Sequence, residues 1–338
     1  MDVKTLDFSK FQGSEAARSE FAHELLKAFS NAGVVKLINH GFDGETMSRL
    51  FRWSEEFFSL PMEEKLKFPN VDGPKPQRGW SSVGSEKTGT LNTHDKISLE
   101  RVEHDGRADF KTSQEHFDIG RSDDKEFPNL WPSESAIPGF KEWTEQYFRN
   151  AEQITLDLLS ALDMAMTMPN GTLSRQCGGP PASELRLNYF PATRASNIMD
   201  GSSTQRIWQH TDFGVMTLLA QDTRGGLEIE DRRNPGTFQP APLVEKNELI
   251  VMMGDILERW TNGMLRATLH RVTAPTGTSL EADPNAVLPA RFSVAFFLKP
   301  HRDSSAGPVK YLVDANRESQ YEEMTAIEYQ RLRTSVVY

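Results

Sequence analysis

The sequence predicts a mainly β fold with flanking helices, because two kinds of pattern follow one another along its 338 residues. Segments with helical periodicity occur in the first half, and short β-type runs separated by Gly, Pro and Asn turns dominate from Glu184 onward. Closely spaced short strands of this kind are typical of an antiparallel sandwich or barrel. The hydrophobic fraction of 37% and the charged fraction of 25% are ordinary for a globular enzyme.

Amphipathic helices are expected ahead of the strands, with Gly33 and Pro61 as the stop signals of the first two. A buried strand over residues 34–38 separates these two helices, and the third should brace the sheet from outside. A short helix is also expected near the carboxyl terminus. The four predicted helices cover residues 14–32, 45–60, 139–166 and part of 325–338.

Residues 69–138 carry few periodic patterns and are rich in Gly, Pro, Ser and Asp, so long loops with short elements are expected there. Long loops of this kind often form a lid or a substrate wall. We divide the chain into an amino-terminal region, 1–138, and a catalytic core, 139–338, and expect the two to form one structural unit. The β-type runs of the core cover residues 185–190, 214–220, 227–230, 249–253, 269–274 and 292–298.

A possible metal site lies in residues 208–221, which show a β-strand pattern. Because alternate side chains of a strand point to the same face, His210 and Asp212 should converge on one ion, and His270 supplies a second imidazole. Two imidazoles and one carboxylate make a facial triad that holds ferrous iron and leaves positions open for an oxidant. A closed zinc site would need a fourth ligand, and none is indicated nearby.

The His-x-Asp pattern alone is weak evidence, since with 8 His and 48 acidic residues about one such pair is expected by chance. Arg291 and Ser293 strengthen it, because they share the same i, i+2 strand geometry and offer a guanidinium fork and a hydroxyl to one carboxylate. Gly225 and Gly226 lack the Lys and helix start of a phosphate loop, so a tight turn is expected there. Gly254-Asp255 is likewise a turn signal.

With these residues in place, the chain resembles the iron(II)/2-oxoglutarate-dependent dioxygenases of the isopenicillin N synthase-like group. The amino-terminal segments 33–41 and 57–65 are similar to the same group, so the resemblance covers roughly the whole chain. It implies a double-stranded β-helix, a jelly-roll form, with iron at one open end. The matching core segments, in order, are residues 188–191, 210–214, 217–222, 225–227, 254–255, 261–263, 270–272 and 291–293.

The resemblance implies a role for each matching residue. His210, Asp212 and His270 are expected to be the iron ligands. The distal carboxylate of 2-oxoglutarate is expected on Arg291 and Ser293, with Asn188 contacting the cosubstrate near the metal. Phe297 lies where relatives place a substrate-facing aromatic residue, and an ordinary core phenylalanine is the alternative.

The implied reaction oxidises a C–H bond of a small organic molecule and releases succinate and CO2, with iron(II), 2-oxoglutarate and O2 as the required components. A role in specialised metabolism is expected. Three alternatives stay open: an iron- and O2-dependent oxidase of the same fold that does not use 2-oxoglutarate, a hydroxylase of proteins or nucleic acids, and a non-catalytic binding module. Substrate identity and oligomeric state are not predicted.

One position departs from the family pattern. The group's usual Asn-Tyr-Tyr-Pro is replaced here by residues 188–191, Asn-Tyr-Phe-Pro, so the hydroxyl before the proline is missing. Strand alternation places Phe190, not Tyr189, on the face of Asn188. Cosubstrate affinity or orientation is therefore expected to differ from the family norm.

Composition narrows the class of partner. The net charge of −10 disfavours a nucleic-acid partner, because phosphate binding needs a basic face. No stretch approaches the roughly 20 apolar residues of a membrane helix, and the amino terminus has no apolar signal core. The single cysteine, Cys177, fits a reducing compartment, and no partner marks it as a nucleophile. A cytoplasmic enzyme acting on a small molecule is expected.

Overall fold

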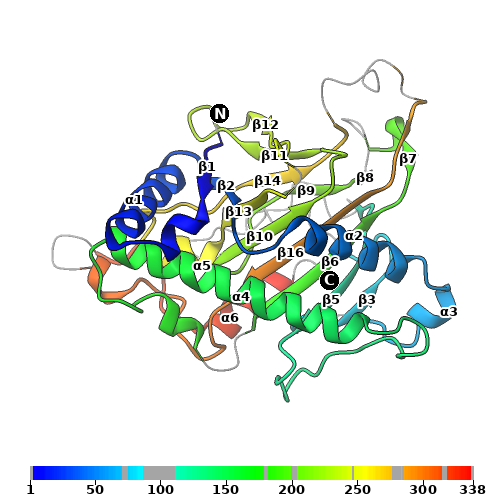
Figure 1. The fold of residues 1–338 in the computed structure, drawn as a ribbon, viewed down its shortest axis with the longest axis horizontal. Coiled ribbons are helices and arrows are strands. Elements are labelled where there is room, and N and C mark those ends of the chain that lie inside the picture. The colour runs from blue at the N-terminus through cyan, green and yellow to red at the C-terminus, as the bar shows by residue number, and fades with distance from the viewer. Residues whose placement is uncertain are drawn as a thin grey trace.

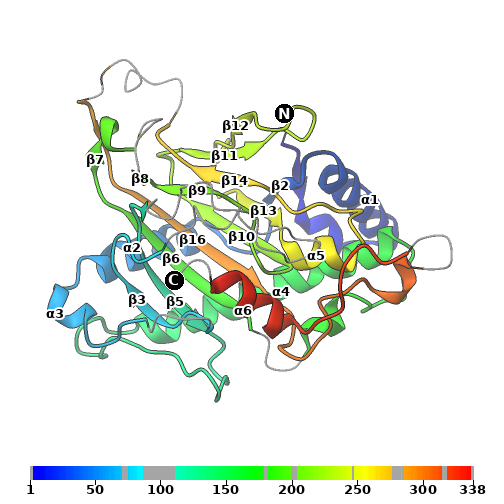
Figure 2. The same ribbon diagram turned by 180° about the vertical axis from the view of Figure 1, so that it is seen from behind.

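The fold consists of two main β-sheets with helices on the outside (Figures 1 and 2). It was obtained as a computed structural model, which describes residues 3–70, 75–86, 111–178, 182–198, 204–245, 247–275, 283, 285–313 and 318–335. The large sheet has the strand order β1-β2-β13-β10-β16-β6-β5-β3, and the small sheet has the order β12-β11-β14-β9. The predicted jelly-roll core is confirmed.

Antiparallel pairing dominates both sheets, and only β1 and β2 run parallel within the large one. The large sheet contains β1 (Thr5–Asp7), β2 (Val34–Ile38), β3 (Gly79–Ser81), β5 (Glu115–Gly120), β6 (Glu184–Phe190), β10 (Met216–Gln221), β13 (Leu249–Met253) and β16 (Arg291–Leu298). The small sheet contains β9 (Ile207–His210), β11 (Leu227–Glu230), β12 (Phe238–Pro240) and β14 (His270–Val272). Two short pairs join β4 (Lys111–Thr112) to β8 (Thr204–Gln205) and β7 (Thr193–Arg194) to β15 (Val287–Leu288).

The helices form where the sequence places their caps. Ser14 caps the first helix by accepting a hydrogen bond from the backbone N–H of Ala17, and Gly33 ends it with a left-handed φ of 76°. A side chain at Gly33 would also collide with the guanidinium of Arg232. The helices are α1 (Glu15–Ala32), α2 (Gly44–Phe58), α3 (Met62–Lys65), α4 (Phe140–Ala165), α5 (Asp255–Trp260) and α6 (Ala326–Thr334).

The large sheet has an outer face that is covered by helices and an inner face that is turned toward the small sheet. On β16, Val294 and Phe296 belong to the outer apolar cluster, where Phe148 of α4 packs edge-on against Phe296 with 5.0 Å between ring centroids. Ala295 and Phe297, the alternate residues, belong to or pack against a separate inner cluster. The predicted bracing role of α4 is thereby confirmed, and the alternation directs one set of β16 side chains to the site.

Residues 69–138 contain short strands within the described parts, as predicted, and residues 71–74 and 87–110 lie outside the described residues. Both β3 and β5 come from this amino-terminal region; β3 pairs with β5, and β5 pairs with β6 of the core. Among the described residues, no helix combines the length and apolar character needed to cross a bilayer.

The sequence predicted only a turn at Gly254-Asp255, whereas the structure has helix α5 there. The turn is real but leads at once into six helical residues. Gly254 is required there, since a Cβ atom would lie 2.2 Å from the carbonyl oxygen of Gly214. This close approach lets the backbone N–H of Asp255 donate to the carbonyl of Asp212 at 2.8 Å.

Candidate active site

His210 and His270 form a cross-strand pair between β9 and β14, the two strands at one end of the small sheet. Their ring centroids lie 4.3 Å apart. His210 Nδ1 lies 2.8 Å from the carbonyl oxygen of Trp208, and His270 Nδ1 lies 3.0 Å from that of Thr268. A proton on each Nδ1 donates to its carbonyl, which leaves both Nε2 lone pairs available for a metal.

Asp212 completes the cluster, but not for the reason that the sequence suggested. The strand β9 ends at His210, so Asp212 lies in the turn before β10 rather than two steps along a strand. Its Oδ1 is nevertheless 3.5 Å from His210 Nε2 and 3.9 Å from His270 Nε2. The hydroxyl of Thr217 donates to the other oxygen, Oδ2, and fixes the carboxylate. One potential ligand atom from each of the three residues therefore lies within 4.8 Å of the others.

The protonation of Asp212 and His270 fits a metal-ligand set, whereas at His210 burial is outweighed by the Asp212 carboxylate, which raises the pKa of His210. Burial opposes ionisation of Asp212, but the two imidazoles and the Thr217 hydroxyl outweigh it and hold the pKa of Asp212 well below its usual range. Burial, with the neighbouring His210, lowers the pKa of His270 to about 4. Asp212 is thus a carboxylate and His270 a neutral imidazole at neutral pH, which are the forms that bind a metal.

A buried guanidinium marks a second part of the site. Arg291, at the start of β16, is 1% exposed, and burial lowers its pKa to about 10. It donates to the carbonyl of Gly225 at 2.9 Å, to Gln221 Oε1 at 2.9 Å and to the Ser293 hydroxyl at 3.2 Å. No carboxylate within the described part of the chain forms an ion pair with it, so a buried cation here is left for an anionic ligand to neutralise.

Asn188 and Ser293 face each other across β6 and β16. The Asn188 amide donates weakly to the Ser293 hydroxyl at 3.5 Å, and its Oδ1 is buried without a partner among the described residues. Phe190 is fully buried in the inner cluster, whereas Tyr189 packs against the outer one. The predicted side for Phe190 is confirmed, and no tyrosine hydroxyl takes its place on the Asn188 face of β6.

The metal cluster, Arg291, Ser293 and Asn188 line one cavity, which holds about 950 Å³ of empty space, part of it continuous with solvent. In the registers of β10, β16 and β6, the residues on the face toward the cavity lie side by side in rows, called rungs here. Successive rungs are about 7 Å apart, twice the rise per residue of a strand. The first rung carries Gln221, Ser293 and Asn188, the second Leu219, Ala295 and Arg186, and the third Thr217, Phe297 and Glu184. Phe297 lines the cavity on the third rung, the one whose Thr217 holds the Asp212 carboxylate.

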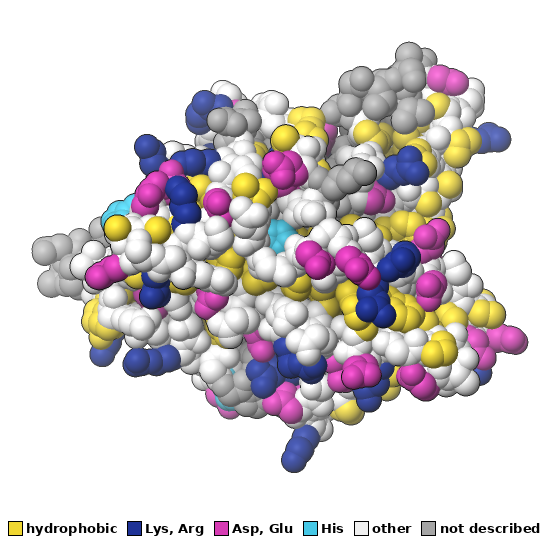
Figure 3. All heavy atoms as spheres, in the orientation of Figure 1, with side chains coloured by type: hydrophobic (Ala, Val, Ile, Leu, Met, Phe, Trp, Pro, Cys, Tyr) yellow, Lys and Arg dark blue, Asp and Glu magenta, His cyan; other side chains and the backbone are white. Residues whose placement is uncertain are grey.

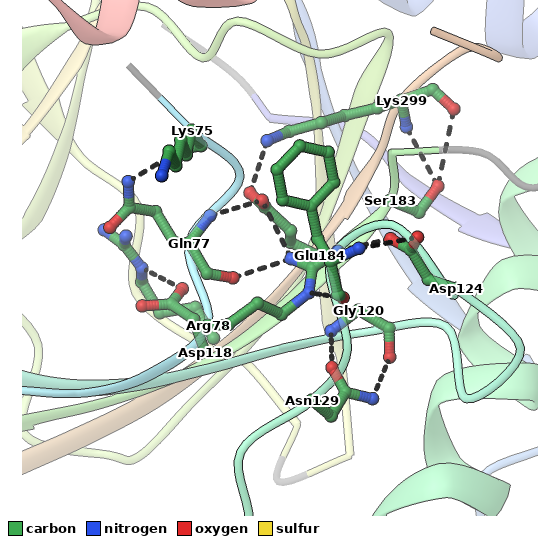
Figure 4. Close-up of polar contacts among 12 residues, drawn as sticks. Lys75, Gln77, Arg78, Asp118, Gly120, Asp124, Asn129, Ser183, Glu184 and Lys299 are labelled. Atoms are coloured by element: carbon green, nitrogen blue, oxygen red, sulfur yellow. Dashed lines mark hydrogen bonds and ion pairs between the residues drawn. The ribbon is translucent and has the colours of Figure 1, made fainter. Parts of the chain in front are cut away.

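One wall of the cavity, formed by Glu184, Arg186, Glu86 and Lys299 and called here the far wall, is charged, which the sequence did not predict. Figure 4 shows the contacts around Glu184. Glu184 accepts hydrogen bonds from the backbone N–H of Gln77 at 2.9 Å and from Arg78 at 3.2 Å, and it pairs with the ammonium of Lys299. Alternation could have revealed part of this wall, because Lys299 continues the face of Arg291 and Ser293, and Glu184 continues that of Asn188.

Arg186 carries the middle of the same wall. It pairs with Asp118 at 2.7 Å and with Glu86 at 2.8 Å, and Glu86 also accepts from the Gln114 amide. The positive Arg186 and the negative Glu86 both line the cavity, so this wall carries charges of both signs.

The terminal helix α6 closes one side of the cavity with Gln330 and Thr334, one helical turn apart. Tyr329 anchors this helix by donating to Asp255 Oδ2 at 2.9 Å. The Asp255 side chain therefore accepts a hydrogen bond from α6, and its backbone N–H donates to the carbonyl of Asp212. Asp255 is not part of the metal cluster. The sequence predicted this helix but not its place at the site.

The residues present fit both groups that the family resemblance implies. Two imidazoles with available Nε2 atoms and one fixed carboxylate suit iron(II), which accepts this mixed donor set and keeps positions open. The buried guanidinium of Arg291, which forms no ion pair with a carboxylate of the described residues, lies about two rungs from the metal cluster. It suits one end of a dicarboxylate. This agreement rests on the donor set and on the unpaired charge of Arg291.

Comparisons with known proteins agree with the geometry. The model of the "non-haem dioxygenase in morphine synthesis N-terminal" family matches residues 3–134, and that of the "2OG-Fe(II) oxygenase superfamily" matches residues 181–300. The 2-oxoglutarate-dependent dioxygenase ecdK of Aspergillus rugulosus is 52% identical over all of both chains. The proline hydroxylase buaE of Petromyces alliaceus is 38% identical, again over all of both chains.

Among solved structures, a full-length Neurospora crassa protein in complex with alpha-KG superimposes with a TM-score of 0.83 at 29% identity, covering 98% of this chain and 95% of that one. The fold, the metal cluster and these likenesses together define an iron- and 2-oxoglutarate-dependent oxygenase. The chain belongs to the 2OG-Fe(II) oxygenase superfamily.

The predicted reaction class is thereby confirmed. The protein is a 2-oxoglutarate-dependent dioxygenase that acts on a small molecule and needs Fe(II), 2-oxoglutarate and O2. The alternative of an oxidase that does not use 2-oxoglutarate is not supported, since the relatives are named for that cosubstrate.

Proposed function

We propose that His210, Asp212 and His270 hold the iron. When bound, the iron supplies the oxidising chemistry with O2. The protein's part is to fix three donor atoms on one side, with Nδ1 of each imidazole tied to its own chain and Asp212 Oδ2 tied to Thr217. The observation that carries this proposal is the convergence of the three donor atoms within 4.8 Å.

We further propose that Arg291, Ser293 and Asn188 bind 2-oxoglutarate. The Arg291 guanidinium and the Ser293 hydroxyl would receive the distal carboxylate, and Asn188 would contact the cosubstrate nearer the metal. The support is the unneutralised buried charge of Arg291 and the unpartnered Oδ1 of Asn188 among the described residues. Phe297, on the rung of Thr217, is proposed to contact the substrate.

The substrate class follows from the far wall. Arg186 and Glu86 present opposite charges to the cavity, and Gln330 adds an amide. A small polar molecule such as an amino acid can hydrogen-bond to both members of this ion pair, and the name of the relative buaE, a proline hydroxylase, points to the same class. We therefore propose an amino acid or a similarly charged small molecule as substrate.

Three further statements are proposals of the same kind. The amino-terminal region 1–138 and the core 139–338 form one structural unit, supported by the pairing of β5 with β6. The protein works in the cytoplasm, supported by the free, buried Cys177. Its substrate is a small molecule rather than a nucleic acid, in line with the interspersed acidic and basic side chains on the face in Figure 3.

The test is anaerobic loading with iron(II) and 2-oxoglutarate, followed by exposure to O2 with a panel of candidate substrates. The panel contains the proteinogenic amino acids, with L-proline first, and thymine, the ligand in another complex of the Neurospora crassa protein, as an uncharged comparator. We expect one amino acid to stimulate succinate release well above the substrate-free rate. Stimulation by thymine alone would contradict the proposed substrate class while leaving the iron and cosubstrate proposals intact.

A further inference from the structure

Arg206 is a second buried guanidinium at the cosubstrate end of the cavity, and nothing in the sequence pattern marks it. It lies between β8 and β9 and is 1% exposed. Its Nη2 donates to the carbonyl of Pro289 at 2.8 Å, whereas Nε and Nη1 are buried without a hydrogen-bond partner among the described residues. Burying unpaired donors of a cation is costly, so a compensating group is expected.

Arg206 and Arg291 lie close to the same two features. Their Cζ atoms are 5.9 Å and 5.1 Å from the centroid of the Phe190 ring. Both also approach the Gly225-Gly226 turn: Arg291 Nε donates to Gly225 O at 2.9 Å, and Arg206 Nη1 is 3.7 Å from the position of a Cβ built on Gly226. Phe190 thus packs beside two cations at the place where the family has a tyrosine.

The charges at this end do not balance. Asp222 is the carboxylate near both guanidiniums, but its oxygens accept from the backbone N–H groups of Phe292 at 2.7 Å and Arg224 at 2.9 Å. Within the described residues it forms no ion pair with either arginine. Two other buried arginines differ, since Arg78 and Arg302 each contact Asp124. Two buried cations therefore share one nearby carboxylate, which leaves a net positive charge.

We propose that Arg206 supplies a second positive charge to the site of the distal carboxylate of 2-oxoglutarate, beside Arg291. It acts through its field from the side of Phe190, because it does not itself line the open cavity. Bound 2-oxoglutarate neutralises the excess charge of the two guanidiniums, and the charge compensates for the hydroxyl that Phe190 lacks. The inference rests on the proposed role of Arg291.

The test compares two ligands that differ only at the distal end, 2-oxoglutarate and 2-oxopentanoate, which has a methyl group in place of the distal carboxylate. Dissociation constants are measured anaerobically with the iron(II)-loaded protein, from the absorption change on 2-oxo acid binding. For Arg206→Gln we expect 2-oxoglutarate to bind roughly tenfold more weakly, as follows from one charge at a separation of several ångströms in a protein interior. Binding of 2-oxopentanoate should change less than about twofold, since it carries no distal charge for the field to act on.

Two further variants make the outcome specific. Arg206→Lys keeps the charge and should retain most of the affinity for 2-oxoglutarate, and it also serves if Arg206→Gln does not fold. Arg232→Gln is the matched control, because Arg232 is also partly buried and donates to backbone carbonyls, but beside Gly33 and away from the cavity. It should affect both ligands equally.

Equal weakening of both ligands in Arg206→Gln, or no weakening of either, would overturn the proposal and leave Arg206 as a support for Pro289. The role of Arg291 is tested separately with the same pair of ligands. If Arg291→Ala discriminates between them and Arg206→Gln does not, only the inference about Arg206 fails. If neither discriminates, the proposed cosubstrate site fails with it.

Discussion

Two parts of the cavity wall are held together in different ways: the part with the proposed iron and 2-oxoglutarate ligands, called here the metal end, and the charged wall with Arg186, called here the far end. At the metal and cosubstrate end, side chains are fixed by backbone carbonyls close by in the fold: His210 by Trp208, His270 by Thr268 and Arg291 by Gly225. At the far end, charged side chains are fixed by other charged side chains, as Arg186 is by Asp118 and Glu86. The first end depends on strand register, and the second depends on side-chain partners.

This difference has a consequence for how each end can change. A backbone carbonyl is present whatever residue occupies the position, so the two histidines keep this support when neighbouring side chains vary, although Asp212 also depends on the Thr217 hydroxyl. A charge pair is lost when either partner is replaced, and the remaining buried charge then costs several kcal/mol. The far wall is therefore changed by concerted substitutions, which suits a surface that selects among substrates.

The strongest test of the metal end is His270→Ala. It removes one of three proposed ligands, so we expect turnover and stoichiometric iron binding to be abolished while the fold is retained, because an open catalytic site contributes less to folding than a closed one. Iron content, succinate release and thermal unfolding measure this. The exposed His23 provides the control, and His23→Ala should behave as the parent protein. Normal iron content and activity in His270→Ala would remove the triad assignment.

Arg291→Ala tests the cosubstrate part of the same end. Loss of a charge-assisted pair of roughly 3 kcal/mol should weaken 2-oxoglutarate binding by a factor on the order of 10². Arg291→Lys should restore binding only in part, because an ammonium lacks the planar fork of the guanidinium. Arg331→Ala, at an exposed position on α6, is the control. A parental affinity in Arg291→Ala would show that the distal carboxylate lies elsewhere.

Gln330→Leu tests the far end. The Nε2 of Gln330 is buried without a partner among the described residues, and the side chain lines the cavity. If it donates to the substrate, Gln330→Leu should raise the substrate KM by up to about tenfold and leave 2-oxoglutarate affinity unchanged. Thermal stability should not fall, because an unsatisfied buried donor is removed. A lower melting temperature with an unchanged KM would instead make Gln330 a structural residue of α6.

The smallest expected effect is that of Phe190→Tyr. It restores the hydroxyl of the family pattern, and a net hydrogen bond of about 0.5 to 1.5 kcal/mol should tighten 2-oxoglutarate binding roughly 2- to 13-fold. Within the described part of the chain, the unpartnered Nε and Nη1 of Arg206 lie beside this ring and are available as donors to the added oxygen. Weaker binding together with lower thermal stability would show that the fully buried ring is a packing residue and that the site is overpacked by one oxygen.

The sequence predicted the metal end better than the far end for a physical reason. Arg291, Ser293 and Phe297 share a face because a strand alternates, and this rule needs no knowledge of other segments. The sequence predicted Asp212 near His210 for a wrong reason, because its pattern indicates one strand through both residues. The strand ends at His210, and Asp212 lies beyond it. Helix α5 was missed because six residues after a glycine turn carry too little periodicity to be recognised.

The far wall could not be assembled from local patterns. Arg186 meets Asp118 across 68 positions and Glu86 across 100, and no periodicity links residues so far apart in the chain. Arg206 likewise gave no signal, because a lone arginine between two short strands is usually exposed. Its burial follows from the packing of Phe190 and of the Pro289 backbone against it, which only the folded structure shows.

The place of α6 bears on the order in which the enzyme becomes complete during its synthesis. Every proposed ligand for iron and 2-oxoglutarate precedes residue 294, whereas Gln330 and Thr334 belong to the last described helix. The amino-terminal part of a chain leaves the ribosome first. The residues of the proposed iron and 2-oxoglutarate sites are therefore synthesised before α6, which is anchored to Asp255 and adds the last wall of the cavity.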